Sequence, residues 1–399
     1  MGMRSEWTKK KLSDIADFNP RETIKKGAVA KKISMDVLRP FYRDVPYYTE
    51  ECFSGGTKFR NGDTIMARIT PCLENGKTAQ VSILNDGEVG FGSTEYIVFR
   101  AKEGIADKDY LYYLVCSPEV REPAIKSMVG SSGRQRVQAD VVKNLQIEVP
   151  PLVEQRKFGS FLKSFDDKIA LNDKINKNLL EQALAIYKDW FCDYALSDGT
   201  LPENWKITTI DAISSLVTRG IAPKYDDSSD QIVLNQKCIR DHTIDISLAR
   251  RHLPKKINEK WISKGDLLIN STGTGTLGRV AQVWFEANNM TVDSHVTIVR
   301  PKDSILQSYI GFWGLSHESE IEAQHTGSTG QTELPRDRVK AMELPLPDED
   351  TLSKFNELVI PMTSTVISNQ EENARLSQLR DALLPKLMSG ELDVSDIDL

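Results

Sequence analysis

The sequence carries the same long helical pattern twice, 197 residues apart. The first copy runs from about residue 150 to 191 and the second from about 346 to 388. In both copies, apolar residues recur at alternating steps of three and four, which is the spacing of a coiled-coil seam. Arg380 is the mismatch between the two seams. A repeated seam of this length predicts two helices that pack against each other, rather than two separate amphipathic helices that each cover a core.

Asparagines interrupt both seams at matching positions. A seam asparagine lowers stability but fixes the register, because its amide must find a partner. We expect antiparallel helices related by a local dyad near residue 174, so that Asn172 meets Asn373 and Asn176 meets Asn369. The predicted interface consists of Leu162, Phe165, Ile169, Asn172, Asn176, Leu179 and Ile186 with Val366, Asn369, Asn373, Leu376 and Leu383.

The second helix also contains Pro361 and Pro385. Because proline lacks a backbone donor, we expect a short helix before Pro361 and a continuous helix after it. Apolar residues on the outer face of the first helix are expected to need partner proteins; they are Ile175, Leu180, Leu184 and Tyr187.

The segments before the two helices repeat as well. Gly62-Asp63, at the start of a strand-like run, is matched by Gly265-Asp266, and the loop 130–134 is matched by 327–331. Gly, Asn and Asp turns separate the short runs, which predicts a mostly antiparallel β region in each half. In the first half the strand-like runs are 32–37, 64–69, 78–83 and 96–99, and helices are expected at 109–116 and 118–128. The residues between these anchors diverge, as expected for two domains of one shape that read different targets.

Composition limits the possible functions without choosing one. The net charge of −6 does not indicate a nucleic-acid-binding protein, but residues 1–155 hold 23 Lys and Arg against 21 Asp and Glu. A whole-chain charge can hide a basic face. The five cysteines never form a C-x-x-C pair, which favours a cytoplasmic location and argues against a metal site. We expect no membrane span, because no apolar run approaches 18 residues.

One motif resembles a nucleotide-binding fingerprint. Residues 273–278 read G-x-G-x-x-G after a strand-like run, but the residues that follow alternate like a strand. A strand offers no helix N-terminus to hold a pyrophosphate, so a turn that approaches a phosphate is favoured over a nucleotide site. No Walker A lysine, H-E-x-x-H or G-x-S-x-G motif is present, so no catalytic residue is nominated.

The glycine-serine loops are the best candidates for binding. Their backbone and hydroxyl groups can contact phosphates, and their arginines can pair with phosphate or read guanine. The occurrence of such loops twice in register favours binding over ordinary solvated turns. The candidate DNA-binding residues are Arg68, Lys77, Ser131, Ser132, Arg134, Arg136, Thr272, Thr274, Arg279, Ser328, Thr329 and Gln331.

Three stretches resemble the specificity subunit of type I restriction–modification systems. Residues 376–392, LSQLRDALLPKLMSGEL, look like the family's C-terminal helix, and residues 150–156 resemble the entry to its central helix. Residues 59–81 resemble a common segment of its target recognition domains. The second helix departs from the family at its start, where Asp348-Glu349-Asp350 replaces the usual P-x-x-E-Q entry.

The resemblance implies an α+β fold with two similar target recognition domains separated by two long antiparallel coiled-coil helices, a pseudo-two-fold tandem repeat. Its expected segments are 1–151 for the first domain, 152–194 for the central helix, 195–347 for the second domain, and 348–399 for the C-terminal helix and acidic tail.

The resemblance also implies the partners. Each domain would read one half of a bipartite site in double-stranded DNA, and the helix pair would act as spacer and dock two methyltransferase subunits. Those subunits would carry S-adenosylmethionine, and two restriction subunits bound through them would carry ATP and Mg. This chain itself would hold no cofactor and perform no catalysis. Helices of about 36 residues span roughly 54 Å, which limits the spacer to some 16 base pairs.

Two other classes of function stay open at this point. A coiled-coil scaffold with two protein-binding domains agrees with the acidic charge, and a steep salt dependence of DNA binding would argue against it. A nucleotide-binding enzyme depends only on residues 273–278, and equilibrium dialysis with ATP and NAD would test it.

Overall fold

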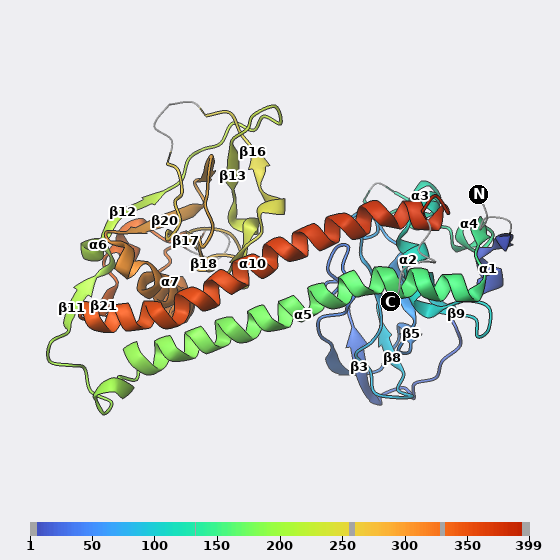
Figure 1. Ribbon diagram of the computed structural model, residues 1–399, viewed down its shortest axis with the longest axis horizontal. Coiled ribbons are helices and arrows are strands. Elements are labelled where there is room, and N and C mark those ends of the chain that lie inside the picture. The colour runs from blue at the N-terminus through green and yellow to red at the C-terminus, as the bar shows by residue number, and fades with distance from the viewer. Residues whose placement is uncertain (1–5, 132, 255–259, 328–331, 393–399) are drawn as a thin grey trace. The chain divides into compact units, whose positions relative to one another are not determined.

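The computed structural model describes residues 6–131, 133–254, 260–327 and 332–392. The chain divides into two compact units (Figure 1). Unit 1 comprises Met1–Asn172 and Glu371–Leu399, and unit 2 comprises Asp173–Gln370. Both boundaries fall inside the two long helices, α5 (Leu152–Phe191) and α10 (Glu349–Met388). Each unit therefore contains one segment of each long helix. Among the described residues, no helix has the length and apolarity to span a membrane.

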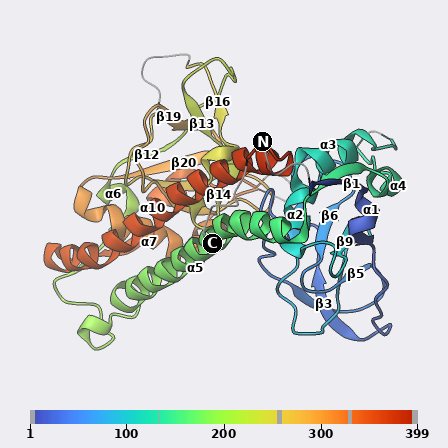
Figure 2. The same ribbon diagram turned by 45° about the vertical axis from the view of Figure 1, so that its right-hand side comes forward.

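Unit 1 combines two four-stranded sheets with short helices. One sheet has the order β2-β9-β6-β7 and the other β4-β3-β8-β5, while β1 pairs with β10. Helix α2 packs against β6 and β9 (Figure 2). The strands are β1 Thr8–Lys11, β2 Ala16–Phe18, β3 Val29–Ile33, β4 Thr49–Cys52, β5 Thr57–Phe59, β6 Thr64–Ala67, β7 Thr78–Gln80, β8 Gly90–Gly92, β9 Tyr96–Ala101 and β10 Gln146–Val149, and the helices are α1 Leu12–Ile15, α2 Lys108–Cys116, α3 Pro118–Lys126 and α4 Ala139–Lys143.

Unit 2 has a corresponding four-stranded sheet, ordered β12-β20-β17-β18, and a three-stranded sheet, β16-β13-β19. Strand β14 pairs with β15 and β11 with β21. The strands are β11 Lys206–Thr209, β12 Ser214–Arg219, β13 Ile232–Leu234, β14 Ile239–Arg240, β15 Thr243–Ile244, β16 Arg250–Arg251, β17 Leu267–Asn270, β18 Val280–Gln282, β19 Met290–Val292, β20 Val296–Pro301 and β21 Glu343–Leu346; the helices are α6 Ile210–Ile213, α7 Gln307–Ser316, α8 Glu318–Ala323 and α9 Arg336–Lys340, with 3-10 turns η2 Ala195–Ser197, η3 Gln236–Cys238, η4 Ile246–Leu248 and η5 Ser304–Leu306.

The expected mixture of helices and mostly antiparallel strands is confirmed, with two differences. Strands β3 and β8 run parallel, as do β13 and β19. The runs expected at 32–37, 64–69 and 78–83 are strands only as far as Ile33, Ala67 and Gln80, because the residues that follow leave the sheets.

The recurring Gly-Asp pair has a structural cause. Asp63 accepts two hydrogen bonds of 2.7 Å from Arg100, and Asp266 accepts hydrogen bonds of 2.8 and 2.7 Å from Arg300. Each aspartate is only 1% exposed, and a buried carboxylate requires such a partner. The Gly-Asp pair and the arginine on the neighbouring strand therefore recur together.

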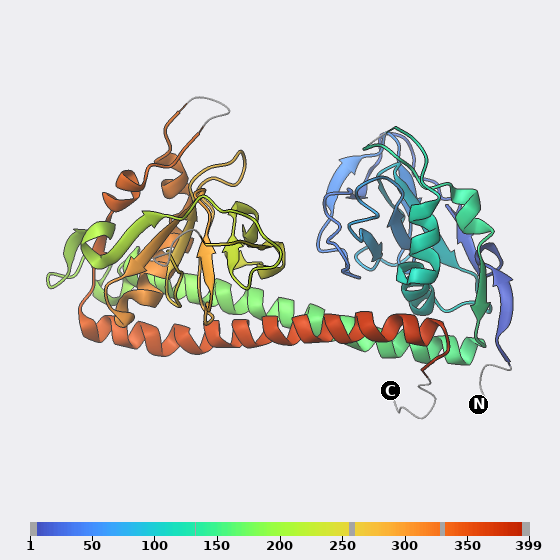
Figure 3. The same cartoon turned by 90° about the horizontal axis from the view of Figure 1, so that it is seen from above.

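The ends of the long helices complete the cores of the units. In unit 1, Phe158 and Leu162 from α5 and Leu387 from α10 are buried with the strands and α2. In unit 2, Phe191 from α5 and Phe355 from α10 are buried with α7. Figure 3 shows the strands of each unit on one side of its own helix segments. The helices therefore belong to the folded units and do not merely connect them.

Tyr187 was expected on the outer face of α5, and this prediction is wrong. Its side chain is 1% exposed and its ring centroid lies 6.1 Å from that of Phe355 and 5.8 Å from that of Tyr309. The reason is that the C-terminal turns of α5 bury a face with a spacing of four, at Ala183, Tyr187 and Phe191, to close the core of unit 2.

The central part of the helix pair has the expected register. Asn172 donates to Asn373 over 2.9 Å within unit 1, and Asn369 donates to Asn176 over 2.8 Å within unit 2. Residues further along α10 face residues nearer the start of α5, so the two helix segments are antiparallel. Of the predicted interface residues, Leu162, Ile169, Asn172, Asn176, Val366 and Asn373 are buried, and Phe165, Leu179, Ile186, Asn369, Leu376 and Leu383 are partly buried.

The prediction that Pro361 interrupts the second helix is wrong. Helix α10 is continuous from Glu349 to Met388. Val359 and Val366 are buried on either side of Pro361, while Pro361 itself is exposed. Burial of the flanking turns offsets the loss of one backbone hydrogen bond, which costs about 3 kcal/mol.

A tryptophan side chain is hydrogen-bonded to the start of each long helix. Trp7 Nε1 donates to Glu154 Oε1 over 3.1 Å, and Trp205 Nε1 donates to Asp348 Oδ2 over 3.0 Å. Asp348 also accepts from the Thr351 backbone N–H over 2.9 Å, which makes it the N-cap of α10. The acidic start of α10 therefore preserves both the cap and the tryptophan contact.

Replacing Asp348 with Ala is expected to destabilise unit 2 by about 1 kcal/mol. The hydrogen bond from the Thr351 backbone is the main cause that lowers the pKa of Asp348 to about 2. Because this pKa lies below the ordinary value, the stabilisation is present above about pH 4 and disappears as the pH falls toward 2. Chemical denaturation of both proteins across this range measures the difference, with Asp348→Asn as the control that keeps a cap. A difference that does not change with pH would contradict the assignment.

Candidate nucleic-acid interface

In unit 1, the turn between β6 and β7 lies against the hairpin 129–136. Ile69 forms a bridge with Arg136, and the Val137 N–H donates to the Arg68 carbonyl over 2.8 Å. The Thr70 N–H donates to the carbonyl of Gln135 over 3.0 Å. The fold therefore brings Arg68 together with the arginines of the glycine-serine loop, which are distant in the sequence.

Glu95 organises these arginines. Arg136 Nη2 lies 2.7 Å from Glu95 Oε1, and Arg68 Nε lies 3.6 Å from Glu95 Oε2. The hydrogen bonds from Arg136 lower the pKa of Glu95 below its ordinary value. One carboxylate serves two guanidinium groups, and Arg134 is exposed on the same hairpin, so the cluster keeps a positive charge. Such a cluster can attract a phosphate. Ser131 is exposed beside it, and Ser132 lies outside the described residues.

Unit 2 contains the same frame. Thr272 bridges Glu333, Thr326 bridges the same residue, and the Leu334 N–H donates to the Ser271 carbonyl over 2.8 Å. Thr272 Oγ1 lies 2.7 Å from His295 Nδ1. The predicted residues Ser328, Thr329 and Gln331 lie outside the described residues.

The two frames carry different side chains at matching positions. Glu333 takes the bridge position that Arg136 holds in unit 1, and His295 takes the position of Glu95 directly before a central strand. Glu333 pairs with Arg219, which also donates to the Leu334 carbonyl over 2.8 Å. The shared backbone and the different side chains would allow the two units to contact different chemical groups.

The remaining predicted residues, Lys77, Thr274 and Arg279, have different surroundings. Lys77 Nζ donates to the carbonyl of Met35 over 2.7 Å, so its charge is partly used within the fold. Arg279 is half-buried at the matching place in unit 2, and Thr274 is exposed at the tip of its turn. Gly273, Gly275 and Gly278 all have positive φ and the turn leads into β18. The motif at 273–278 is therefore a glycine turn between two strands, as expected.

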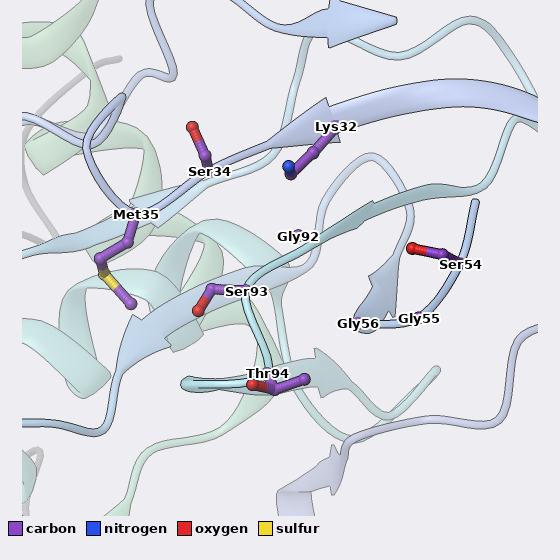
Figure 4. Close-up of a pocket in the computed structure, with 9 residues that line it drawn as sticks. All are labelled: Lys32, Ser34, Met35, Ser54, Gly55, Gly56, Gly92, Ser93 and Thr94. Atoms are coloured by element: carbon purple, nitrogen blue, oxygen red, sulfur yellow. The ribbon is translucent and has the colours of Figure 1, made fainter. Parts of the chain in front are cut away.

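Unit 1 also has a pocket of about 420 Å³ (Figure 4). Ser93 and Thr94 line it and directly precede Glu95. A Cβ atom on Gly92 would lie 2.3 Å from the Ile33 carbonyl oxygen, so glycine allows the close approach of two backbone segments that forms the wall. The other lining residues are Lys32, Ser34, Met35, Ser54, Gly55 and Gly56. Its hydroxyl groups and one lysine suit a polar or anionic ligand.

Sequence reasoning missed Glu95, His295 and Arg219. Glu95 and His295 could have been found, because they directly precede the corresponding strands β9 and β20. Arg219 has no comparable signal, because its contact with Glu333 joins two segments far apart in the chain.

Comparisons with known proteins agree with this architecture. Residues 4–181 match the family model described as the type I restriction modification DNA specificity domain. The MjaIX specificity subunit of a type I restriction enzyme from Methanocaldococcus jannaschii is 25% identical over 315 residues, covering 74% of this chain and 71% of the relative. The HindI specificity subunit from Haemophilus influenzae is 22% identical, covering 97% of this chain and 100% of the relative.

A solved structure agrees at the level of the fold. The type I restriction–modification S subunit from M. genitalium is 14% identical, covers 96% of both chains and has a TM-score of 0.56. This likeness supports the fold alone. Residues 4–181 therefore match a type I restriction modification DNA specificity domain, and the chain as a whole is similar to type I restriction enzyme specificity subunits.

Proposed function

We propose that this chain reads a bipartite DNA site, with each unit contacting one half of it. The observation that carries the proposal is the repeated turn-and-hairpin frame with different charged groups. Arg68, Arg136 and Glu95 stand on this frame in unit 1, whereas Glu333 and His295 stand on it in unit 2. A shared frame presents both units to DNA in the same way, and different side chains allow different bases to be read.

The two repeats are proposed to be related by a pseudo-two-fold axis, with the helix pair as the spacer between half-sites. The pair is also proposed to dock two methyltransferase subunits, which bind S-adenosylmethionine, while two restriction subunits bound through them use ATP and Mg. This chain would then perform no catalysis. Exposed apolar residues on the long helices support docking: Leu171 and Ile175 on α5, and Leu358, Ile360 and Leu379 on α10.

The test is to co-express the chain with its cognate methyltransferase subunit and to map adenine methylation across a genome by long-read sequencing. Two short half-sites across a fixed gap are the expected result. Methylation of a single continuous motif would contradict the bipartite reading. A stable complex that methylates nothing and binds DNA without salt dependence would favour a protein-binding scaffold.

Neutralising the arginine cluster is expected to weaken DNA binding by a similar factor for all sequences. In the variant Arg68→Gln/Arg134→Gln/Arg136→Gln, each lost phosphate contact should reduce the slope of log K against log salt by about 0.9. Glu95→Gln should have the opposite effect, because it removes the carboxylate that competes with phosphate. Fluorescence anisotropy at several salt concentrations measures both effects.

Lys143→Gln is the matched control, because Lys143 lies on α4 and is also paired with an acidic residue, Asp140. Its salt slope should equal that of the unaltered chain. Equal slopes for the control and for the triple variant would argue against phosphate contacts at this turn.

A further inference from the structure

Each unit has a tight turn that carries an aromatic residue in left-handed conformation. Residues 33–44 and 234–245 align without a gap, from the ends of β3 and β13 onward. In this alignment Phe41 corresponds to His242, and an arginine stands two residues before each of them. The φ angles of Phe41 and His242 are 59° and 60°.

A positive φ is unfavourable for a bulky side chain, and glycine or asparagine is the usual residue in such turns. Pro40 before Phe41 is typical of a type II turn, whose next position favours glycine. Asp241 and His242 both have positive φ between the paired residues Arg240 and Thr243, as in a type I′ turn. Aromatic residues at two matching strained positions indicate that the side chains have a function.

The ring of Phe41 is fixed and half-exposed. The Phe41 N–H donates to the Gly76 carbonyl over 3.0 Å, and a Cβ atom on Gly76 would come within 2.6 Å of the ring. The Arg121 guanidinium lies 5.3 Å from the ring centroid and donates to the Glu74 carbonyl over 2.7 Å. Phe41 is nevertheless 52% exposed. An apolar group held in this way is pre-organised for contact with a ligand.

His242 is fixed by a polar contact instead. Its Nε2 atom lies 2.9 Å from Glu318 Oε2, at the start of α8, and its side chain is 31% exposed. The imidazole can exchange hydrogen bonds with a ligand, whereas the phenyl ring of Phe41 can offer only an apolar surface.

Phe41 packs against the turn between β6 and β7, which also carries Arg68 of the arginine cluster. Gly76, which contacts its ring, ends the turn that begins at Arg68 and Ile69 and that packs against the hairpin with Arg136. We infer that Phe41 and His242 are specificity-determining residues, with Phe41 contacting a thymine methyl group in one half-site and His242 hydrogen-bonding a base edge in the other. This inference rests on the proposed function.

The experiment maps methylation by the complex with Phe41→Asn or His242→Asn. Asparagine tolerates left-handed backbone, so it removes the aromatic ring without new strain. Discrimination at one base position should fall roughly tenfold or more, in one half-site for Phe41→Asn and in the other for His242→Asn. The controls are Val29→Ala and Leu248→Ala, which alter apolar side chains 66% and 49% exposed in the same units.

A binding measurement tests the chemistry at Phe41. Replacing the contacted thymine by uracil removes only its methyl group, so it should weaken binding of the unaltered chain but not of Phe41→Asn. Unchanged half-sites in both variants would overturn the inference and leave the bipartite reading intact, as would a loss of methylation that is uniform across sequences. Absence of a split motif for the unaltered chain would instead overturn the proposed function and this inference with it.

Discussion

Arg380→Ala is expected to destabilise unit 1 by about 3–5 kcal/mol, because it leaves a buried carboxylate without its cation. Arg380 forms an ion pair with Asp166, and the two side chains are 8% and 5% exposed. Tyr113 donates to the other oxygen of Asp166 over 2.5 Å. Burial raises the pKa of Asp166, while Arg380 and Tyr113 act in the opposite direction. The aspartate therefore depends on both partners to remain charged.

The loss should be smaller in acid. Without Arg380, the folded-state pKa of Asp166 lies further above its unfolded value, so the folded variant binds the proton more tightly. Its stability then falls as the pH rises from the unfolded pKa through the folded one. Hydrogen exchange measured by mass spectrometry resolves the effect by segment. Protection should fall in the first half of α5 and the end of α10, with no change in unit 2.

Unit 2 supplies a matched control. The seam positions equivalent to Asp166 and Arg380 hold Thr363 and Ala183, and Phe312 on α7 corresponds to Tyr113 on α2. All three polar groups are thus replaced together in the other repeat. The variant Asp166→Thr/Arg380→Ala/Tyr113→Phe should be more stable than Arg380→Ala, because no buried charge is left unpaired. Equal stability of Arg380→Ala and the unaltered chain would show that the ion pair contributes nothing.

Deleting seven residues from each long helix is expected to shorten the gap between half-sites without changing the half-sites. Removing 173–179 from α5 and 366–372 from α10 takes matching segments and retains the pair Asn172–Asn373. Seven residues correspond to about 10 Å of helix, or about three base pairs. They also correspond to nearly two full turns, so the seam keeps its direction. Methylation mapping reports the new gap directly.

Deleting 173–179 from α5 alone is the control for this experiment. It removes Asn176 and shifts the register of everything that follows against α10, so the Asn176–Asn369 pair is lost and methylation should be abolished. Changed half-sites with an unchanged gap in the double deletion would contradict the role of the helices as a spacer.

The register of the helix pair was predictable because it depends on a local periodicity. A seam with steps of three and four identifies the buried face, and asparagines permit only alignments in which their amides meet. Asn172 with Asn373 and Asn176 with Asn369 follow from these two facts. The prediction failed where the helices enter the cores. Tyr187 belongs to the core of unit 2, and Arg380 is buried only because Asp166 faces it.

The candidate interface was predictable in part. The glycine-serine loops and Arg68 could be nominated because the repeats carry them in register. Their charge balance could not be predicted, because Glu95 pairs with Arg136 through the packing of two segments that are distant in the sequence. Similarly, the left-handed backbone shared by Phe41 and His242 appears only in the fold.

The sequence by itself determined the two long helices, the antiparallel register of their asparagine pairs and the recurring Gly-Asp motif, because these depend on periodicity and on residues close together in the chain. The tertiary structure alone decided which helix faces close the cores, how Pro361 is accommodated, and which charges neutralise one another. Burial and ion pairing depend on what each side chain meets across the fold, and that neighbour is not encoded by local spacing.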